Sequence, residues 1–252
     1  MRVARILAEN EVRYARVDGD RAELFSAAPW LGGAPTGRFV AFREGDLRAP
    51  VEPYKILCVG RNYAAHAKEL GNEVPAEPLL FLKPKTALLA HGGVVELPPE
   101  SARVEHEAEL GVVIGKTARR VSRESALDHV FGYTCVCDVT ARDLQKKDGQ
   151  WSRAKGFDTF CPCGPWIETN VDPRGLRVRC LVNGATKQDG STAQMVFDVA
   201  ALIAYASRAM TLEPGDLLVT GTPEGVGPLA PGDTLTVDIE MIGALTVTVG
   251  KA

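Results

Sequence analysis

Residues 105–114 read Glu-His-Glu-Ala-Glu-Leu-Gly-Val-Val-Ile, a pattern that predicts a β-strand entering a buried core. The second half of the segment is almost wholly apolar, as expected of a strand covered on both faces. In the first half, Glu105, Glu107 and Glu109 recur at every second position, so a strand places all three carboxylates on one face. Like charges in such a row repel one another unless something neutralises them.

Two interpretations of this acidic row are open. A solvated sheet edge is the ordinary one, but a second acid, Asp138, also ends an apolar strand, where an isolated buried charge is costly. A hard cation such as Mg²⁺ resolves both problems, because it prefers oxygen ligands and keeps several waters. Three carboxylates leave about three positions, two of which a 2-keto or 1,3-diketo acid could occupy. These residues alone do not say which two of the three glutamates bind.

The rest of the chain predicts a β-dominated α+β protein with few helices and no βαβ units. We expect residues 1–50 to form a small N-terminal β unit and residues 54–252 to form the main body of the protein. An alternating run before Asn183-Gly184 predicts a hairpin. Asp198 caps the clearest helix, and a shorter helix is expected over residues 122–129.

Composition excludes several classes of protein. The hydrophobic content of 45% and the charged content of 24% are those of a globular protein. A net charge of -3 without basic clusters gives no reason to expect a nucleic-acid partner. There is no secretory signal pattern at the N-terminus and no apolar run of the roughly 20 residues that a membrane span requires. We therefore expect a cytoplasmic protein without a membrane partner.

Six cysteines leave a further alternative open. Cys135 and Cys137 form one Cys-x-Cys pair, and Cys161 and Cys163 form another, so four thiolates could in principle hold zinc. Structural zinc sites usually leave at least two residues between paired thiolates. Buried, reduced thiols that pack as small apolar residues are the simpler interpretation.

Five ordered blocks of sequence resemble the fumarylacetoacetate hydrolase superfamily. They are Gly-Arg-Asn-Tyr-Ala-Ala-His-Ala-Lys-Glu (60–69), His-Glu-Ala-Glu-Leu (106–110), Asp-Val-Thr-Ala-Arg-Asp-Leu-Gln (138–145), Lys-Gly-Phe-Asp (155–158) and Gly-Thr-Pro-Glu-Gly-Val-Gly (221–227). Each block alone is a weak signal, but their order makes the resemblance specific. It covers the chain from about residue 54 to its end.

The resemblance implies a mixed β-sandwich roll of the family's C-terminal-domain type, normally a homodimer. Its implied metal ligands are Glu107, Glu109 and Asp138, which hold Mg²⁺ or Mn²⁺ and leave Glu105 as a neighbouring charge. Family members hydrolyse acylpyruvates or decarboxylate oxaloacetate-like acids. Others isomerise or tautomerise keto-enol diacids such as oxaloacetate or 2-hydroxyhepta-2,4-diene-1,7-dioate. The single catalytic repeat is similar to the acylpyruvase and oxaloacetate-processing branch, and to isomerases of aromatic compound catabolism.

His66 and Glu69 stand three residues apart, which puts them on one face of a helix. Such a pair is common on protein surfaces. Within the matched block, the resemblance implies a catalytic dyad in which the carboxylate orients the imidazole and His66 acts as general base.

The resemblance also implies a set of groups that hold the small keto-acid substrate and its developing negative charge. Without it, Arg142 and Lys155 fit surface salt bridges equally well, and the Gly-Thr-Pro run is simply a turn. The implied set comprises catalytic Lys155 and the substrate-binding residues Arg142, Gln145, Thr222 and Arg61. A metal-binding or interaction protein without catalysis is the rival class, but it would need neither the dyad nor Lys155.

Overall fold

The computed structural model describes all 252 residues of the chain. A twelve-stranded, a five-stranded and a three-stranded β-sheet make up most of the fold, and only four short α-helices accompany them. The predicted β-dominated α+β class is therefore confirmed. None of the helices combines the length and the apolar character that crossing a membrane requires.

The largest sheet runs through the whole molecule in the order β4-β3-β2-β1-β14-β12-β11-β17-β6-β7, with β5 beside β1 and β8 beside β14. Its strands are β1 (Arg2–Ala8), β2 (Glu11–Asp18), β3 (Arg21–Phe25), β4 (Pro35–Ala41), β5 (Leu47–Arg48), β6 (Ile56–Gly60), β7 (Leu79–Lys83), β8 (Leu88–Leu89), β11 (Ala108–Ile114), β12 (Val130–Cys137), β14 (Cys161–Glu168) and β17 (Leu217–Val219). Most neighbours are antiparallel, but β17 and β6 are parallel, so the sheet is mixed.

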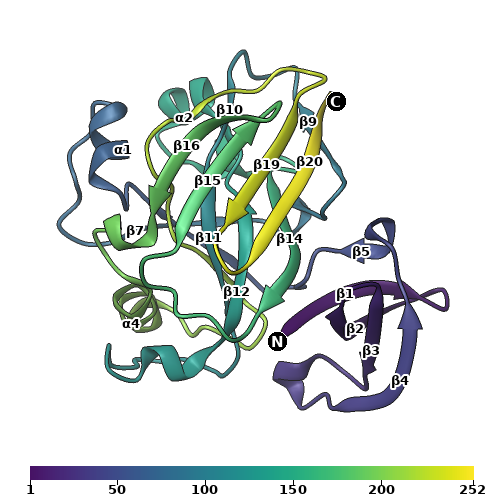
Figure 1. Cartoon of the computed structure of the whole chain (residues 1–252). Coiled ribbons are helices and arrows are strands. Elements are labelled where there is room, and N and C mark those ends of the chain that lie inside the picture. The colour runs from purple at the N-terminus through teal and green to yellow at the C-terminus, as the bar shows by residue number, and fades with distance from the viewer.

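The five-stranded sheet lies in front of β11 and β12 in Figure 1, so that the two sheets form a sandwich. Its strands, in spatial order, are β16 (Ala185–Ser191), β15 (Arg177–Val182), β19 (Thr234–Ile239), β20 (Gly243–Lys251) and β9 (Val94–Leu97). β15 and β16 meet at Val182 and Ala185, which confirms the hairpin predicted at Asn183-Gly184. A core of 36 buried residues fills the space between the sheets.

The helices are α1 (Ala64–Glu69), α2 (Arg142–Asp148), α3 (Ser152–Gly156) and α4 (Val199–Ala209). The predicted cap of α4 is confirmed, because Oδ1 of Asp198 accepts a hydrogen bond of 2.8 Å from the backbone N–H of Ala201. The helix expected over residues 122–129 is wrong. Only a single 3₁₀ turn, Ala126–His129, forms there, because the chain leads straight into β12.

The N-terminal strands β1 to β4 stand apart from the sandwich in Figure 1 and surround a small core of eight buried residues. They form an antiparallel meander within the small β unit predicted over residues 1–50. The meander is not separate from the body, because β1 pairs with β14 at Arg2 and Val3. The edge of the N-terminal unit thus continues the large sheet.

The acidic segment 105–114 is two strands rather than the single strand predicted. β10 (Val104–His106) belongs to the three-stranded sheet with β13 (Thr140–Ala141) and β18 (Gly227–Pro228). β11 begins at Ala108 and belongs to the large sheet. The chain changes sheets at Glu107, which places this side chain at the corner where the two sheets meet.

Candidate metal centre and active site

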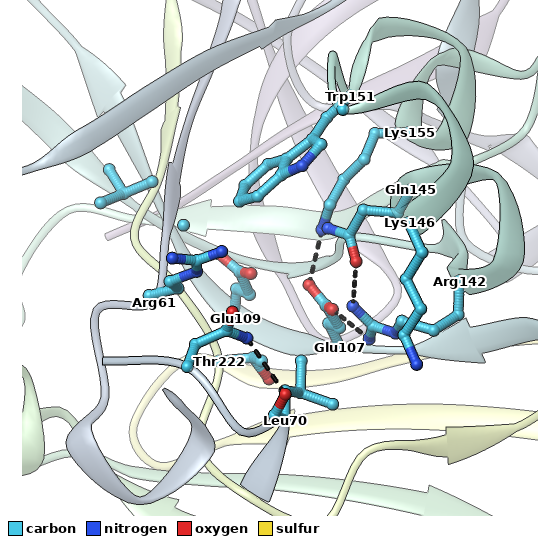
Figure 2. A pocket seen from close by; sticks show the side chains of 14 residues that line it. Arg61, Leu70, Glu107, Glu109, Arg142, Gln145, Lys146, Trp151, Lys155 and Thr222 are labelled. Atoms are coloured by element: carbon cyan, nitrogen blue, oxygen red, sulfur yellow. Dashed lines mark hydrogen bonds and ion pairs between the residues drawn. The ribbon is translucent and has the colours of Figure 1, made fainter. Parts of the chain in front are cut away.

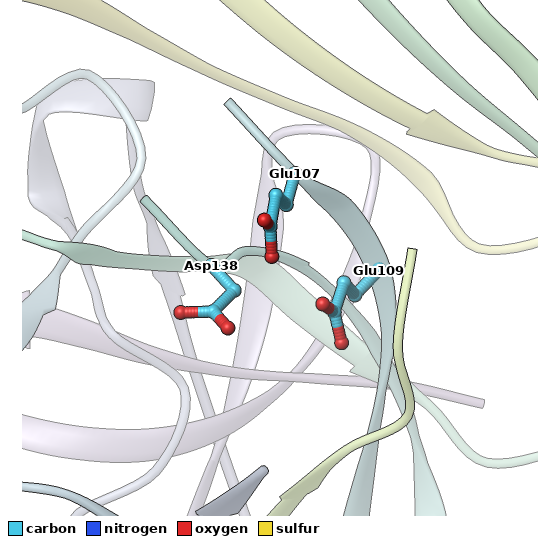
Figure 3. Close-up of side chains that lie close together, drawn as sticks. All are labelled: Glu107, Glu109 and Asp138. Atoms are coloured by element: carbon cyan, nitrogen blue, oxygen red, sulfur yellow. The ribbon is translucent and has the colours of Figure 1, made fainter. Parts of the chain in front are cut away.

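Three buried carboxylates converge where β11 and β12 lie side by side (Figure 3). One oxygen each of Glu107, Glu109 and Asp138 lies within 4.8 Å of the other two, and no other group of His, Cys, Asp or Glu converges in this way. The antiparallel register explains the meeting, because Ala108 pairs with Cys137 and brings the two strand ends together. The backbone N–H of Asp138 donates to the carbonyl of Glu107 at 2.9 Å, which fixes the corner.

Two cations from the segment that follows neutralise this cluster. Nζ of Lys155 lies 2.7 Å from Oε2 of Glu107 and 2.5 Å from Oδ2 of Asp138. Arg142 donates from Nη2 to Oε1 of Glu107 at 2.5 Å and from Nε to Oε2 of Glu105 at 2.6 Å. Glu105 thus pairs with Arg142 and Arg103 and is not one of the converging carboxylates. These salt bridges offset the repulsion between the glutamates of the acidic row.

The two glutamates of the cluster differ in their electrostatics. Burial by itself raises the pKa of Glu107, but the charges of Lys155 and Arg142 outweigh it and hold that pKa below its usual value. Burial raises the pKa of Glu109 well above its usual value, and the negative charges of Asp138 and Glu107 add to the effect. Glu109 is therefore the carboxyl with the greatest need for an additional cation.

The donor set fits a hard divalent cation. All three converging groups are carboxylates, all are buried, and each presents an oxygen to the same point. Mg²⁺ and Mn²⁺ accept such oxygen ligands, whereas a soft-metal site would require thiolates. Burial raises the pKa of Glu109, and the negative charges of Asp138 and Glu107 raise it further; a cation bound beside Glu109 would offset both effects.

The alternative zinc site is wrong. All six cysteines are free and buried. Cys135 and Cys137 belong to the core between the two sheets, whereas Cys161 and Cys163 belong to a second apolar cluster of 11 residues. Burial also raises the pKa of Cys161 to about 12, which disfavours the thiolate that zinc requires.

A cavity of about 310 Å³ opens beside the carboxylates (Figure 2). Seven of the ten predicted site residues line it: Glu107, Glu109, Arg142, Gln145, Lys155, Thr222 and Arg61. The size suits a small organic acid. Trp151 closes one wall, packing edge-on against Phe81 with the ring centroids 5.2 Å apart. The sequence patterns did not single out this tryptophan.

Most polar groups of the cavity already have protein partners. Gln145 accepts a hydrogen bond of 2.7 Å from Nη1 of Arg142, and Thr222 donates to the carbonyl of Ala108 at 2.8 Å. Arg61 and Lys146 differ, because these two cations line the cavity without an ion pair. Their charge remains available to an anionic ligand.

The side chains of the predicted dyad, His66 and Glu69, lie within hydrogen-bonding distance of each other. Nδ1 of His66 lies 3.2 Å from Oε2 of Glu69 across one turn of α1. The other oxygen of Glu69 accepts a hydrogen bond of 3.0 Å from the backbone N–H of Gly225, which ties α1 to the loop that carries Thr222. Neither dyad residue lines the cavity, although the charge of His66 acts on Glu107. The role of His66 in moving a proton stays a prediction.

Gln188 is a buried residue that the sequence analysis missed. Its Oε1 lies 3.1 Å from Nδ1 of His106 and accepts a hydrogen bond of 3.0 Å from the backbone N–H of Ala108. Its Nε2 donates to Oγ1 of Thr222 and to the carbonyl of Pro223, both at 2.7 Å. One amide therefore joins both neighbours of Glu107 to the loop that carries Thr222 and Pro223. No local pattern in β16 marks it.

The chain belongs to the fumarylacetoacetate hydrolase family. The family model described as fumarylacetoacetate hydrolase C-terminal matches residues 55–250, and a model for the N-terminal part of Rv2993c-like proteins matches residues 1–50. A protein of Mycobacterium tuberculosis, Rv2993c, is 44% identical over 256 residues, which cover 98% of this chain and 97% of the relative.

Relatives with named activities are also similar. The mitochondrial oxaloacetate decarboxylase of Dictyostelium discoideum is 51% identical over 188 residues, which cover 72% of this chain and 86% of the relative. The mitochondrial oxaloacetate tautomerase fahd2 of Xenopus laevis is 46% identical over 214 residues, which cover 80% of this chain and 67% of the relative.

Two solved structures show the same fold. The 2-hydroxyhepta-2,4-diene-1,7-dioate isomerase of Mycobacterium marinum superposes with a TM-score of 0.91 at 44% identity, covering 100% of this chain and 98% of that one. The fumarylpyruvate hydrolase of Pseudomonas aeruginosa, solved with Mn²⁺ and pyruvate, gives a TM-score of 0.74 at 37% identity, covering 81% and 91%. The predicted family and its sandwich-roll fold are thereby confirmed.

Proposed function

We propose that this protein is a Mg²⁺- or Mn²⁺-dependent enzyme that acts on a C–C bond of a small 2-keto or 1,3-diketo acid. The reaction would be hydrolysis of an acylpyruvate or decarboxylation of an oxaloacetate-like acid. The observation that carries the proposal is the buried three-carboxylate centre at the wall of a cavity of about 310 Å³. The named decarboxylase relative and the hydrolase solved with Mn²⁺ and pyruvate support it.

Glu107, Glu109 and Asp138 would hold the cation, whose chemistry is that of a Lewis acid that stabilises negative charge on the keto oxygen. The protein's own cations complete the charge balance. Lys155 pairs with Oε2 of Glu107 and Oδ2 of Asp138. If those oxygens bound a metal ion instead, the ammonium group of Lys155 would be free to interact with the substrate. Preorganised charges of this kind favour the transition state because they need no reorganisation during the reaction.

Groups around the cavity would orient the substrate. Arg61 and Lys146 present unpaired charges that suit a carboxylate. Gln145 lines the cavity, and because its amide oxygen is held by Arg142, its amide N–H groups would be the donors for the substrate. Thr222 stands on the loop that Gln188 and the dyad both brace. These contacts would fix the keto acid with its reacting carbon near the carboxylate centre.

His66 would move the proton. With Nδ1 facing Glu69, the carboxylate stabilises the tautomer or cation that carries a proton on Nδ1, and Nε2 is the atom left to exchange a proton. In hydrolysis this nitrogen would take a proton from water, and in decarboxylation it would deliver a proton to the carbon that loses CO₂.

A second function, isomerisation or tautomerisation of keto-enol diacids such as oxaloacetate, has its own support. The identities of the tautomerase (46%) and the isomerase (44%) to this chain lie between those of the decarboxylase (51%) and the hydrolase (37%). The dyad and the charged cavity serve this reaction equally, because it needs proton transfer and stabilised enolate charge but no hydrolytic water.

The decisive experiment is a substrate panel with Mg²⁺ or Mn²⁺ in which the products are identified. Acetylpyruvate, fumarylpyruvate, oxaloacetate and 2-hydroxyhepta-2,4-diene-1,7-dioate are each incubated with the protein. Carboxylate products report cleavage, CO₂ reports decarboxylation, and a ¹H NMR change without loss of carbon reports isomerisation. Absence of turnover on the whole panel, with metal bound, would refute the enzymatic proposal.

We also propose that the protein is a homodimer. Strand β7 forms one edge of the large sheet and exposes Leu79 and Leu82, an unprotected apolar edge of the kind that proteins usually cover. Light scattering coupled to size exclusion measures the mass directly. A monomeric mass at micromolar concentration would contradict the proposal.

A further inference from the structure

Lys83 is a buried cation that the site described above does not use. It ends strand β7, its side chain is 0% exposed, and it does not line the cavity. Its Nζ lies 2.5 Å from Oδ1 of Asp138 and 3.3 Å from the carbonyl of Val139. An ammonium group in this position requires both acceptors, because burying a charge without partners is costly.

The two oxygens of Asp138 therefore pair with different lysines. Lys83 contacts Oδ1 and does not line the cavity, whereas Lys155 contacts Oδ2 and does line it. Lys155 also touches Glu107, so its ammonium stands among the converging oxygens. Lys83 pairs with no other carboxylate, and on Asp138 it contacts Oδ1, the oxygen that Lys155 leaves free.

Lys83 is also the less movable of the two lysines. It lies in a regular strand whose backbone pairs with Ile56 of β6, and its side chain is fully buried. Moving Nζ away from Oδ1 would leave a buried charge without its counter-ion, which is strongly unfavourable. The contact between Lys83 and Asp138 is thus a fixed feature of the site.

We propose that Lys83 is a positioning residue that keeps Oδ1 of Asp138 engaged, so that Asp138 offers a single oxygen and the centre favours Mg²⁺ or Mn²⁺ over Ca²⁺. The inference rests on the proposed metal-dependent function. Mg²⁺ demands a compact octahedral shell, whereas Ca²⁺ takes six to eight oxygens and readily uses both oxygens of one carboxylate. A lysine that occupies one oxygen of Asp138 prevents this carboxylate from binding Ca²⁺ through both of its oxygens.

The ratio of two affinities tests this better than one affinity does. Removing Lys83 deletes a positive charge near the centre, which by itself strengthens the binding of any cation. Mg²⁺ and Ca²⁺ carry the same charge, so this effect largely cancels in the ratio of their dissociation constants. The ratio then reports whether each ion is coordinated by one oxygen or by both oxygens of Asp138.

The experiment compares Lys83→Met, which keeps the length and apolar stem of the side chain, with Lys85→Met on the same segment. Lys85 is exposed and makes no salt bridge, so it is the matched control. Isothermal titration calorimetry gives the dissociation constants of Mg²⁺ and Ca²⁺, and displacement of Mn²⁺ followed by electron paramagnetic resonance gives an independent ratio. We expect the preference for Mg²⁺ to fall about tenfold in Lys83→Met, the low end of the 10–100-fold effect that partners of metal ligands have on metal affinity, and to stay unchanged in Lys85→Met.

Three outcomes would overturn the inference. A folded Lys83→Met variant whose Mg²⁺/Ca²⁺ ratio stays within about twofold of the wild type contradicts it. So does a wild-type protein that binds Ca²⁺ as tightly as Mg²⁺, a measurement that needs no variant. Lys83→Leu, which likewise offers no donor to Oδ1 of Asp138, provides a second variant if Lys83→Met does not fold. A wild type that binds no divalent cation refutes the proposed function as well, which separates the failure of that function from a failure of this inference alone.

Discussion

The ammonium group of Lys155 stands 2.5 Å from Oδ2 of Asp138, among the oxygens that would hold a metal. Helix α3 carries the lysine, and Asp138 follows β12, so the contact joins a helix to the end of a strand of the large sheet. A lysine in this place compensates the acidic cluster and competes with a divalent cation for the same atoms. The metal-free and metal-bound forms should therefore depend on Lys155 in opposite ways.

We predict that Lys155→Met destabilises the metal-free protein by about 3–5 kcal/mol, because buried Glu107 and Asp138 lose a counter-charge. Adding Mg²⁺ should restore stability in proportion to the logarithm of its concentration. Urea denaturation with and without Mg²⁺ measures both effects. Lys147→Met, an exposed change on α2, serves as the control. A loss below about 1 kcal/mol would show that Lys155 does not balance the cluster.

Metal binding and proton transfer should separate in two further variants. Glu109→Ala removes a converging oxygen and should abolish both Mg²⁺ binding and turnover. His66→Ala removes the proposed base but no converging oxygen, so Mg²⁺ binding should remain while kcat falls by a factor of about 10²–10⁴. Calorimetry and steady-state kinetics on the best substrate check the pair. Full turnover in His66→Ala would refute the dyad assignment.

The stability of the metal-free protein should fall as pH rises above the usual range of a glutamate. The pKa of Glu109 is raised in the folded state, so its protonated form stabilises folding below its unfolded pKa and this stability is lost as pH rises through the folded pKa. Glu107 acts in the opposite sense, because its lowered pKa contributes stability that is lost only as pH falls. Glu109→Gln should therefore flatten the alkaline limb alone. Thermal unfolding over a pH series, in chelator, measures it, and an unchanged alkaline limb would contradict the prediction.

Gln188 should hold in place both the chain turn at Glu107 and the loop that carries Thr222. In Gln188→Leu, the backbone N–H of Ala108 loses its acceptor and Thr222 loses a donor, so each buried group left without a partner should cost about 1–3 kcal/mol. Displacement of the loop should lower kcat by on the order of 10²-fold. Lys187→Met, next to it but exposed, is the control. Retention of both stability and kcat would show that the amide has no positioning role.

The conservative variant Gln188→Glu separates these two contributions. Its carboxylate still accepts a hydrogen bond from Ala108 but donates none to Thr222 when ionised. We expect it to keep the corner at Glu107 and to impair substrate binding, which raises KM more than it lowers kcat. Equal losses in Gln188→Glu and Gln188→Leu would argue that the amide serves stability alone.

Local chemistry determined much of this protein in advance. The alternation of Glu105, Glu107 and Glu109 marked an acidic face, and the apolar runs beside it marked buried strands, because side-chain periodicity is a property of the strand itself. Asn183-Gly184 fixed a hairpin and Asp198 capped a helix for equally local reasons. Combined with the family resemblance, these signals were enough to predict the fold class and the three converging carboxylates.

The tertiary structure alone decided which groups complete the site. Lys83 meets Asp138 across 55 positions of sequence and Gln188 meets Ala108 across 80, and no periodic pattern links residues so far apart. The break in the acidic strand at Glu107 likewise arises because two sheets compete for its neighbours. Sequence periodicity sets which face a side chain occupies, whereas its partners depend on how distant strands pack against it.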